Sequence, residues 1–185
     1  MDKRPNPQGK GLVPVLDSLT ESRAKIAVPP KQIDQISSEL FTSLFVLHSR
    51  FQFKPVVDKT YYLYWRNNDF HLSLIAPQEW SGSSYGKYVG ESVLHKDVTW
   101  TLTLNPSAAK DEELMRLIED RRQQFQQALS DAKTVDEVLP VYLESLPFYQ
   151  RVLASALSSS LTISMQKSRI SGLSYQQAKG LLPKT

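Results

Sequence analysis

The chain has 185 residues, of which 41% are hydrophobic and 22% charged, and these proportions exclude a wholly disordered chain. It contains no cysteine, which excludes disulfides, thiolate zinc sites, iron–sulfur clusters and cysteine catalysis. The net charge of +3 lies entirely in residues 1–31, because the remaining residues carry equal numbers of basic and acidic side chains. Composition therefore gives no support for a broad nucleic-acid-binding surface on the globular part.

The first 30 residues are predicted to form an extended, basic, proline-rich arm. Five of the eleven prolines lie there: Pro5, Pro7, Pro14, Pro29 and Pro30. Proline fixes φ, lacks a backbone donor and restricts the residue before it, so regular structure is disfavoured. The positive charge makes Lys3, Arg4 and Lys10 candidate contacts with a partner. No apolar run approaches the ~18 residues of a membrane span, and the first residues do not resemble a signal peptide, so we expect a soluble cytoplasmic protein without a membrane partner.

Residues 31–182 are predicted to be a single α+β domain. It begins with an amphipathic helix over residues 31–50, in which apolar residues recur every three or four positions from Ile33 to Leu47. Residues 51–104 are rich in aromatic and β-branched residues, which favour strands. We expect strands over four runs: Tyr61–Arg66, Phe70–Ala76, Tyr88–His95 and Val98–Leu104.

The four strands are predicted to form an antiparallel meander. Asn67-Asn68-Asp69 suits a three-residue hairpin, and Lys96-Asp97 suits a two-residue one. The connection over residues 77–87 is too short for a helical crossover, which also favours an antiparallel sheet. In the fourth strand Trp100 alternates with threonines, which indicates one buried and one polar face. We expect Trp100 in the core and His71 on the polar face.

Residues 105–182 are predicted to form three to four helices. Asn105-Pro106 is a cap followed by proline, and both Thr134–Glu137 and Ser174–Gln177 have the pattern of a capping box. The helix over residues 148–168 is rich in small residues such as Ala154 and Ser158, which let another backbone approach closely. Intramolecular packing is the first interpretation, and a homodimer through this helix is the alternative.

The sequence contains no recognisable catalytic or metal site. The three histidines, His48, His71 and His95, lie in different elements and not at metal-ligand spacing. There is no Gly-x-Ser-x-Gly elbow, and the glycines from Gly82 to Gly90 fall every fourth residue rather than in a phosphate-binding pattern. We therefore assign no catalytic residue, metal or cofactor, while a small active site built from carboxylates stays open as an alternative.

Aromatic residues are concentrated in the β region, where nine of the eighteen lie between positions 61 and 100. In the first strand, Tyr61 and Trp65 share one face and Tyr62 and Tyr64 share the opposite face. Either helices cover both faces of the sheet, or one aromatic face is available to a ligand or partner.

The same region resembles a known family. The motifs that carry the resemblance are Tyr61-Tyr62-Leu63-Tyr64, the stretch Leu74–Trp80 with its Pro77-x-Glu79-Trp80 turn, Gly90, Thr99-Trp100-Thr101, and Asn6-Pro7 in the arm. The family is catalogued as domain of unknown function 2452 (DUF2452) and has bacterial and eukaryotic members. The resemblance covers residues 5–103 and implies no activity and no catalytic residue.

These features predict a non-catalytic binding or adaptor protein of the cytoplasm that contacts a protein partner through the aromatic sheet region and the basic arm. The candidate binding residues are Tyr62, Tyr64, Glu79, Trp80 and Tyr85. Two alternatives stay open. An RNA- or ribosome-associated factor would use the aromatic side chains for base stacking, and a small enzyme would need a pocket near Glu79 and Trp80.

Overall fold

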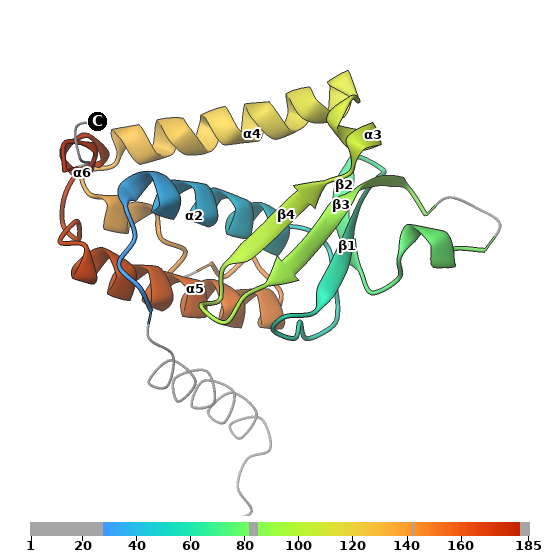
Figure 1. Ribbon diagram of the computed structural model, residues 1–185, viewed down its shortest axis with the longest axis horizontal. Helices are drawn as coiled ribbons and strands as arrows, with labels where there is room; N and C mark the ends of the chain where they lie inside the picture. The colour runs from blue at the N-terminus through green and yellow to red at the C-terminus, as the bar shows by residue number, and fades with distance from the viewer. Residues whose placement is uncertain (1–27, 82–84, 142, 182–185) are drawn as a thin grey trace, which may run out of the picture.

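The computed structural model describes residues 28–81, 85–141 and 143–181 and has an α+β fold (Figure 1). The elements follow the order α2 (Ile33–Leu47), β1 (Thr60–Arg66), β2 (Asp69–Ser73), η1 (Pro77–Glu79), β3 (Lys87–Leu94), β4 (Trp100–Leu104), α3 (Pro106–Ala109), α4 (Glu112–Asp131), η2 (Val135–Val138), α5 (Phe148–Lys167) and α6 (Tyr175–Lys179), where η denotes a 3-10 helix. This order confirms the predicted sequence of helix, four-stranded antiparallel sheet and C-terminal helices. The predicted extended arm and its candidate contacts Lys3, Arg4 and Lys10 lie outside the described residues.

The sheet has the strand order β2-β1-β3-β4, so the predicted meander is wrong. Strand β1 pairs antiparallel with both β2 and β3, and the chain from β2 to β3 passes across β1. Hydrophobic burial explains this strand order. Strand β1 has aromatic residues on both faces, and a strand in the middle of a sheet has both of its faces covered. The edge of β2 is extended by Arg50, whose backbone bonds Phe70 and Leu72.

The two hairpin turns have lengths opposite to those predicted. Arg66 pairs with Asp69, which leaves a two-residue turn of Asn67 and Asn68. Their φ angles are 50° and 61°, which fit a type I′ turn, and asparagine tolerates this region better than most residues. The second turn has three residues, 96–98, because the amide of His95 donates to the carbonyl of Thr99.

One glycine of the family-like motifs is required by close backbone packing. Strand β3 has a bulge at Val89, because Gly90 lies opposite Leu63 of β1 while Tyr88 lies opposite the next residue, Tyr64. A Cβ atom at Gly90 would lie 2.1 Å from the carbonyl oxygen of Thr103 on β4. Only glycine fits this position without moving β4.

The core lies between the sheet and helices α2 and α5. Trp100 is 1% exposed, as predicted, and its backbone amide donates to Ser43 Oγ of α2 at 2.9 Å. Tyr61 packs against Trp100 from β1, and Leu157 and Leu161 of α5 are fully buried in the same core. One face of the sheet is therefore occupied by helices, which lie on one side of it in Figure 1.

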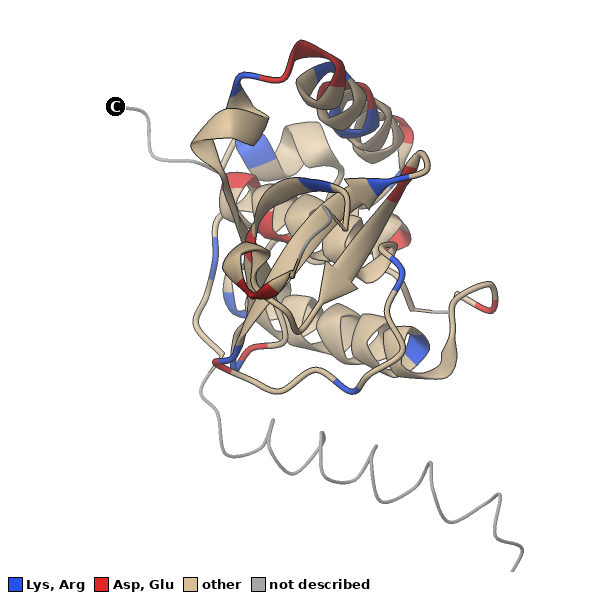
Figure 2. Ribbon diagram, turned by 90° about the vertical axis from the view of Figure 1, so that its right-hand side faces the viewer, with Lys and Arg blue, Asp and Glu red and all other residues tan. Residues whose placement is uncertain are grey.

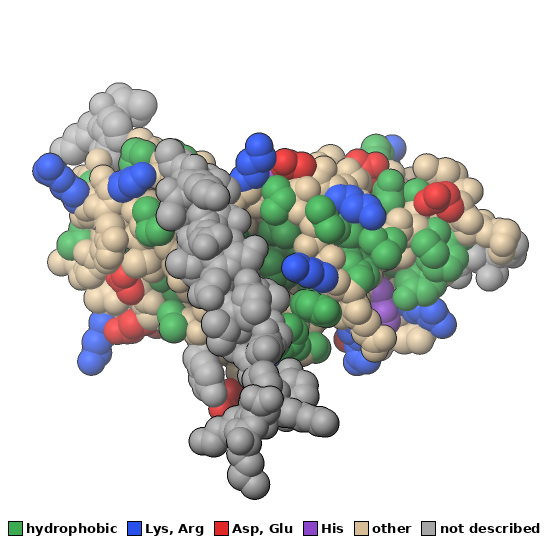
Figure 3. Space-filling model, turned by 90° about the horizontal axis from the view of Figure 1, so that it is seen from below, with side chains coloured by type: hydrophobic (Ala, Val, Ile, Leu, Met, Phe, Trp, Pro, Cys, Tyr) green, Lys and Arg blue, Asp and Glu red, His purple; other side chains and the backbone are tan. Residues whose placement is uncertain are grey.

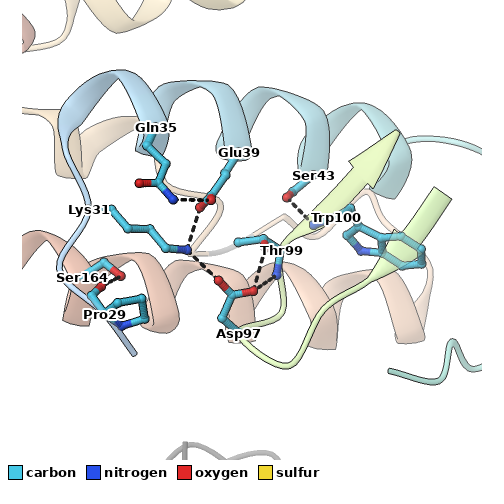
Figure 4. Close-up of polar contacts among 9 residues, drawn as sticks. All are labelled: Pro29, Lys31, Gln35, Glu39, Ser43, Asp97, Thr99, Trp100 and Ser164. Carbon is cyan, nitrogen blue, oxygen red and sulfur yellow. Dashed lines mark hydrogen bonds and ion pairs between the residues drawn. The ribbon is translucent and has the colours of Figure 1, made fainter. Parts of the chain in front are cut away.

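Residues 28–31, which the sequence placed largely in the arm, are bonded to the helices and the sheet (Figure 4). Lys167 and Ser164 of α5 donate to the carbonyl oxygens of Val28 and Pro29. Lys31 is 4% exposed, and its ammonium lies 2.6 Å from a carboxylate oxygen of Glu39 and 2.6 Å from one of Asp97. The entering chain is thus bonded to α2, α5 and the β3–β4 hairpin.

The helical part agrees with the predicted caps at one position and differs at another. Ser174 and Gln177 form a capping box at α6, as predicted. At Thr134 no side-chain cap is made, and the predicted helix is instead the short 3-10 helix η2. Asp136 accepts hydrogen bonds from Ser171 and Gly172, which bonds η2 to the loop before α6.

The small residues of α5 pack inside the chain. Ala154 and Ala156 are 1% and 2% exposed, and Ser158 is 4% exposed. The first interpretation, packing within the chain, therefore holds for these three residues of α5, which contacts α2, and a homodimer through the 148–168 helix stays a prediction. Within the described residues, no helix has both the length and the apolarity to span a membrane.

Candidate binding surface

The face of the sheet turned away from the helices carries a cluster of aromatic side chains. Tyr62 and Tyr64 of β1 lie on this face, opposite His71 and Ser73 of β2 and opposite Glu91 and Tyr88 of β3. Tyr62 and Tyr64 each contact the ring of Tyr88, at centroid distances of 6.4 and 5.5 Å. In Figure 1 the β2–β3 connection, with η1, is the element on this side of the sheet.

Trp80 is positioned by the short helix η1. Pro77 occupies the first turn of η1, where its missing N–H costs nothing. Glu79 Oε2 accepts a 2.7 Å hydrogen bond from the backbone amide of Ala76, which closes the turn. The chain then leads Trp80 back over β1, where its ring stacks on Tyr85 with a centroid distance of 4.5 Å and an interplanar angle of 8°.

Tyr64 lies beneath this stacked pair and is 2% exposed, so the expectation that it reaches the surface is wrong. Its ring meets Trp80 and Tyr85 edge-on, at centroid distances of 6.2 and 5.3 Å. Its hydroxyl donates to the carbonyl of Ile75 at 2.8 Å and accepts from Trp80 Nε1 at 3.0 Å. Tyr64 therefore supports the surface from below, because both of its neighbours come from the β2–β3 connection that crosses β1.

Tyr62, Trp80, Tyr85 and Tyr88 remain half-buried, and we call these four side chains together with Arg66 the outer aromatic face. The guanidinium of Arg66 lies 5.0 Å from the ring centre of Tyr85. Sequence reasoning missed Arg66 and Tyr88 as members. The position of Tyr88 depends on the bulge at Val89 of β3, which no local pattern indicates.

The charges around the outer aromatic face are mixed in sign. Glu79 and Glu91 are exposed there beside Arg66, and Arg50 forms a 2.7 Å ion pair with Asp69 at the end of β2. Figure 2, which is turned toward this side of the molecule, shows basic and acidic segments interspersed. The arrangement does not provide the one-sided positive potential typical of a phosphate-binding surface.

Three ionisable rings on this face, those of Tyr64, His71 and Tyr88, have pKa values shifted in the direction that favours the uncharged form. Burial, with the nearby carboxylate of Glu91, raises the pKa of Tyr88 to about 12. Burial also raises the pKa of Tyr64 above 10.0. For His71, burial and the neighbouring charge of Arg50 lower the pKa below 6.5. The surface thus presents neutral rings with polar edges, which suits contact with a partner more than proton transfer.

The described residues hold no group of three or more histidines and carboxylates that could bind a metal ion. His71 and His95 are separated by β1, since β2 and β3 are not neighbours. The carboxylates of Glu39 and Asp97 border a hollow with Asp58 and His95, but both are paired with Lys31. Burial opposes the charge on Lys31, yet the bonds from Asp97 and Glu39 outweigh it and raise its pKa above 10.5. We interpret this cluster as structural.

Comparison with known proteins gives one match. The family model described as "Protein of unknown function (DUF2452)" matches residues 29–128. The match begins where the entering chain bonds to α5 and ends within α4. No curated protein and no solved structure matches the chain.

Proposed function

Because the chain belongs to the DUF2452 family of proteins of unknown function, we propose a function from its own surface: it is a non-catalytic binding or adaptor protein that contacts a protein partner through the outer aromatic face. The observation that carries this proposal is the stacked pair of Trp80 and Tyr85, held over the sheet by Tyr64. We place its action in the cytoplasm, in keeping with a chain free of cysteine.

The aromatic side chains of this surface are held in place before a partner binds. Tryptophan, tyrosine and arginine dominate binding energies at protein interfaces because they bury large areas and lose little conformational entropy. Here the Trp80 indole is already fixed by its hydrogen bond to Tyr64 and by its stack on Tyr85. Little conformational entropy is therefore lost when this side chain contacts a partner. The helices occupy the opposite face of the sheet, which leaves this face to a partner.

A protein partner is favoured over RNA by the local charge. Stacking on aromatic rings would serve single-stranded RNA, but Glu79 and Glu91 would repel the phosphates that accompany each base. The basic residues Lys3, Arg4 and Lys10 of the arm supply a second, salt-sensitive attachment in this proposal. If the partner is RNA, nuclease treatment will abolish the interaction.

Catalysis near Trp80 is not part of the proposal. The carboxylate of Glu79 bonds the backbone of Ala76, and this closure of η1 accounts for a glutamate at that position. A general acid or base needs a group free to exchange a proton with a substrate.

The test is site-specific photo-crosslinking in the cell of origin. A photoreactive phenylalanine analogue replaces Tyr62 or Glu91 on the proposed surface, and Gln123 on the exposed side of α4 as the matched control. The proposal predicts a discrete, nuclease-resistant protein adduct from the first two positions and none from the third. Adducts from Gln123 alone, or adducts that nuclease removes, would contradict it.

A further inference from the structure

A second surface, which shares no residue with the outer aromatic face, is an apolar groove beside α5. It has a volume of about 360 Å³. One wall is the segment before β1, residues 54–57, and the other is the first half of α5. Its apolar lining includes Val56, Val57, Val98, Tyr149, Val152 and Leu153.

The walls of this groove contain hydrophobic side chains that are exposed to solvent. Val56, Val57 and Tyr149 are 57%, 41% and 38% exposed, and they are three of the seven large hydrophobic side chains that are exposed among the described residues. Figure 3, which views the molecule from below, shows hydrophobic side chains gathered over this side. Contiguous apolar surface of this kind marks a place where another segment binds.

The N-terminal entry of the chain is fixed beside the same groove. Ser164 and Lys167, which hold the carbonyls of Pro29 and Val28, follow Leu153 by eleven and fourteen residues on α5. These spacings are close to three and four helical turns, so all three residues lie on one side of α5, about 17 and 21 Å apart along its axis. His95 lines both this groove and the neighbouring hollow that contains Pro29.

The arm has a segment that suits the groove. Residues 12–16, Leu-Val-Pro-Val-Leu, are entirely apolar, and Pro14 favours an extended chain. Eleven residues separate Leu16 from Val28, and the twelve steps between them can span up to about 40 Å when extended, well beyond the distance required.

Acidic and basic side chains are available for pairing at two points of this route. The hollow beside Pro29 is lined by Asp58, in addition to the two carboxylates that already pair with Lys31, and the connecting residues of the arm include Arg23 and Lys25. At the far end of the path, Asp17 follows the apolar segment and Lys54 lines the groove.

We propose that residues 12–16 of the arm bind in this groove of the same chain. The contact covers Val56, Val57 and Tyr149 while leaving the basic residues of the arm tip outside.

The test uses pairs of spin labels in the full chain, whose lack of cysteine allows labelling without background. Labels are attached at Ser18→Cys, two residues after the docking segment, and at Gln52→Cys, an exposed position two residues before the groove wall, so that the charges of Asp17 and Lys54 are kept. The proposal predicts one narrow distance peak by pulsed electron resonance. Val57→Asp, which changes a half-exposed side chain, should remove most of that peak, and so should Leu16→Asp in the arm.

Leu74→Asp is the matched control, since Leu74 is 47% exposed on the chain between β2 and β3, and it should leave the peak unchanged. A broad distance distribution that neither aspartate changes would overturn the proposal. A narrow peak that also appears when singly labelled chains are mixed would overturn it as well, because the occupant would then be the arm of a second copy.

Discussion

Trp80 Nε1 donates a 3.0 Å hydrogen bond to the hydroxyl of Tyr64, sixteen residues earlier, and this bond joins the β2–β3 connection to the central strand of the sheet. The same hydroxyl donates to the carbonyl of Ile75, so Tyr64 holds the connection at its start and at its middle. The outer aromatic face depends on this one buried tyrosine.

Replacing Tyr64 by phenylalanine should therefore destabilise the fold and loosen Trp80. The loss of its hydroxyl leaves the Trp80 indole N–H and the Ile75 carbonyl unpaired, which should cost about 1 kcal/mol by urea denaturation. Trp80 emission should also become more readily quenched by acrylamide. Tyr62→Phe, on the same face of the same strand, is the control; equal effects of the two changes would contradict the supporting role of Tyr64.

Trp100→Ala should cost on the order of 3–5 kcal/mol, because it removes a 1% exposed indole from the contact between α2 and the sheet. His71→Ala, on the opposite face, should cost only about 0.5 kcal/mol. Thermal unfolding of the two variants measures the difference. Similar costs would mean that the two faces of the sheet have been assigned wrongly.

Lys31→Met should cost about 3 kcal/mol, since it leaves Glu39 and Asp97 facing each other without their shared cation. Lys87→Met is the control, because Lys87 pairs with Asp111 in an exposed position where solvent screens the interaction. Denaturant titration should find the control close to wild type. A control as unstable as Lys31→Met would refute the special role of the buried cluster.

The ion-pair cluster of Lys31, Glu39 and Asp97 makes the stability of the fold depend on pH. Burial opposes ionisation of Asp97, but its bonds to Lys31 and Thr99 outweigh burial and lower its pKa below 3.8. Its contribution is therefore complete above pH 3.8 and is lost as the pH falls through the lowered value in the folded protein. The stability of the wild type should fall more steeply with acid than that of Lys31→Met, and parallel curves would contradict this linkage.

The helix and strands in which hydrophobic residues recur at a regular spacing were predictable from the sequence. The alternation of Trp100 with threonines placed Trp100 in the core, and the apolar spacing from Ile33 to Leu47 located α2. Both depend on short-range patterns that a strand or helix imposes on its own residues.

The relationships that were missed involve distant segments. The order β2-β1-β3-β4 is decided by which strand lies beside β1, and no local pattern carries that information. Tyr64 is buried only because Trp80 and Tyr85 return over it, and Lys31 is buried only because Asp97, 66 residues away, reaches it. Alternation told correctly which side chains share a face of β1 but not which of them would be covered.

The most direct test of the outer aromatic face as a partner-binding surface compares affinity capture from native lysate by three forms of the full chain. These are the wild type, a Trp80→Ala, Tyr85→Ala double variant, and Val141→Ala as an exposed apolar control, each first shown to be folded by circular dichroism. We predict that the wild type and the Val141→Ala control capture the same nuclease-resistant protein partners in equal amounts. The double variant should lose these partners. A folded double variant that captures the same partners in the same amounts would contradict it.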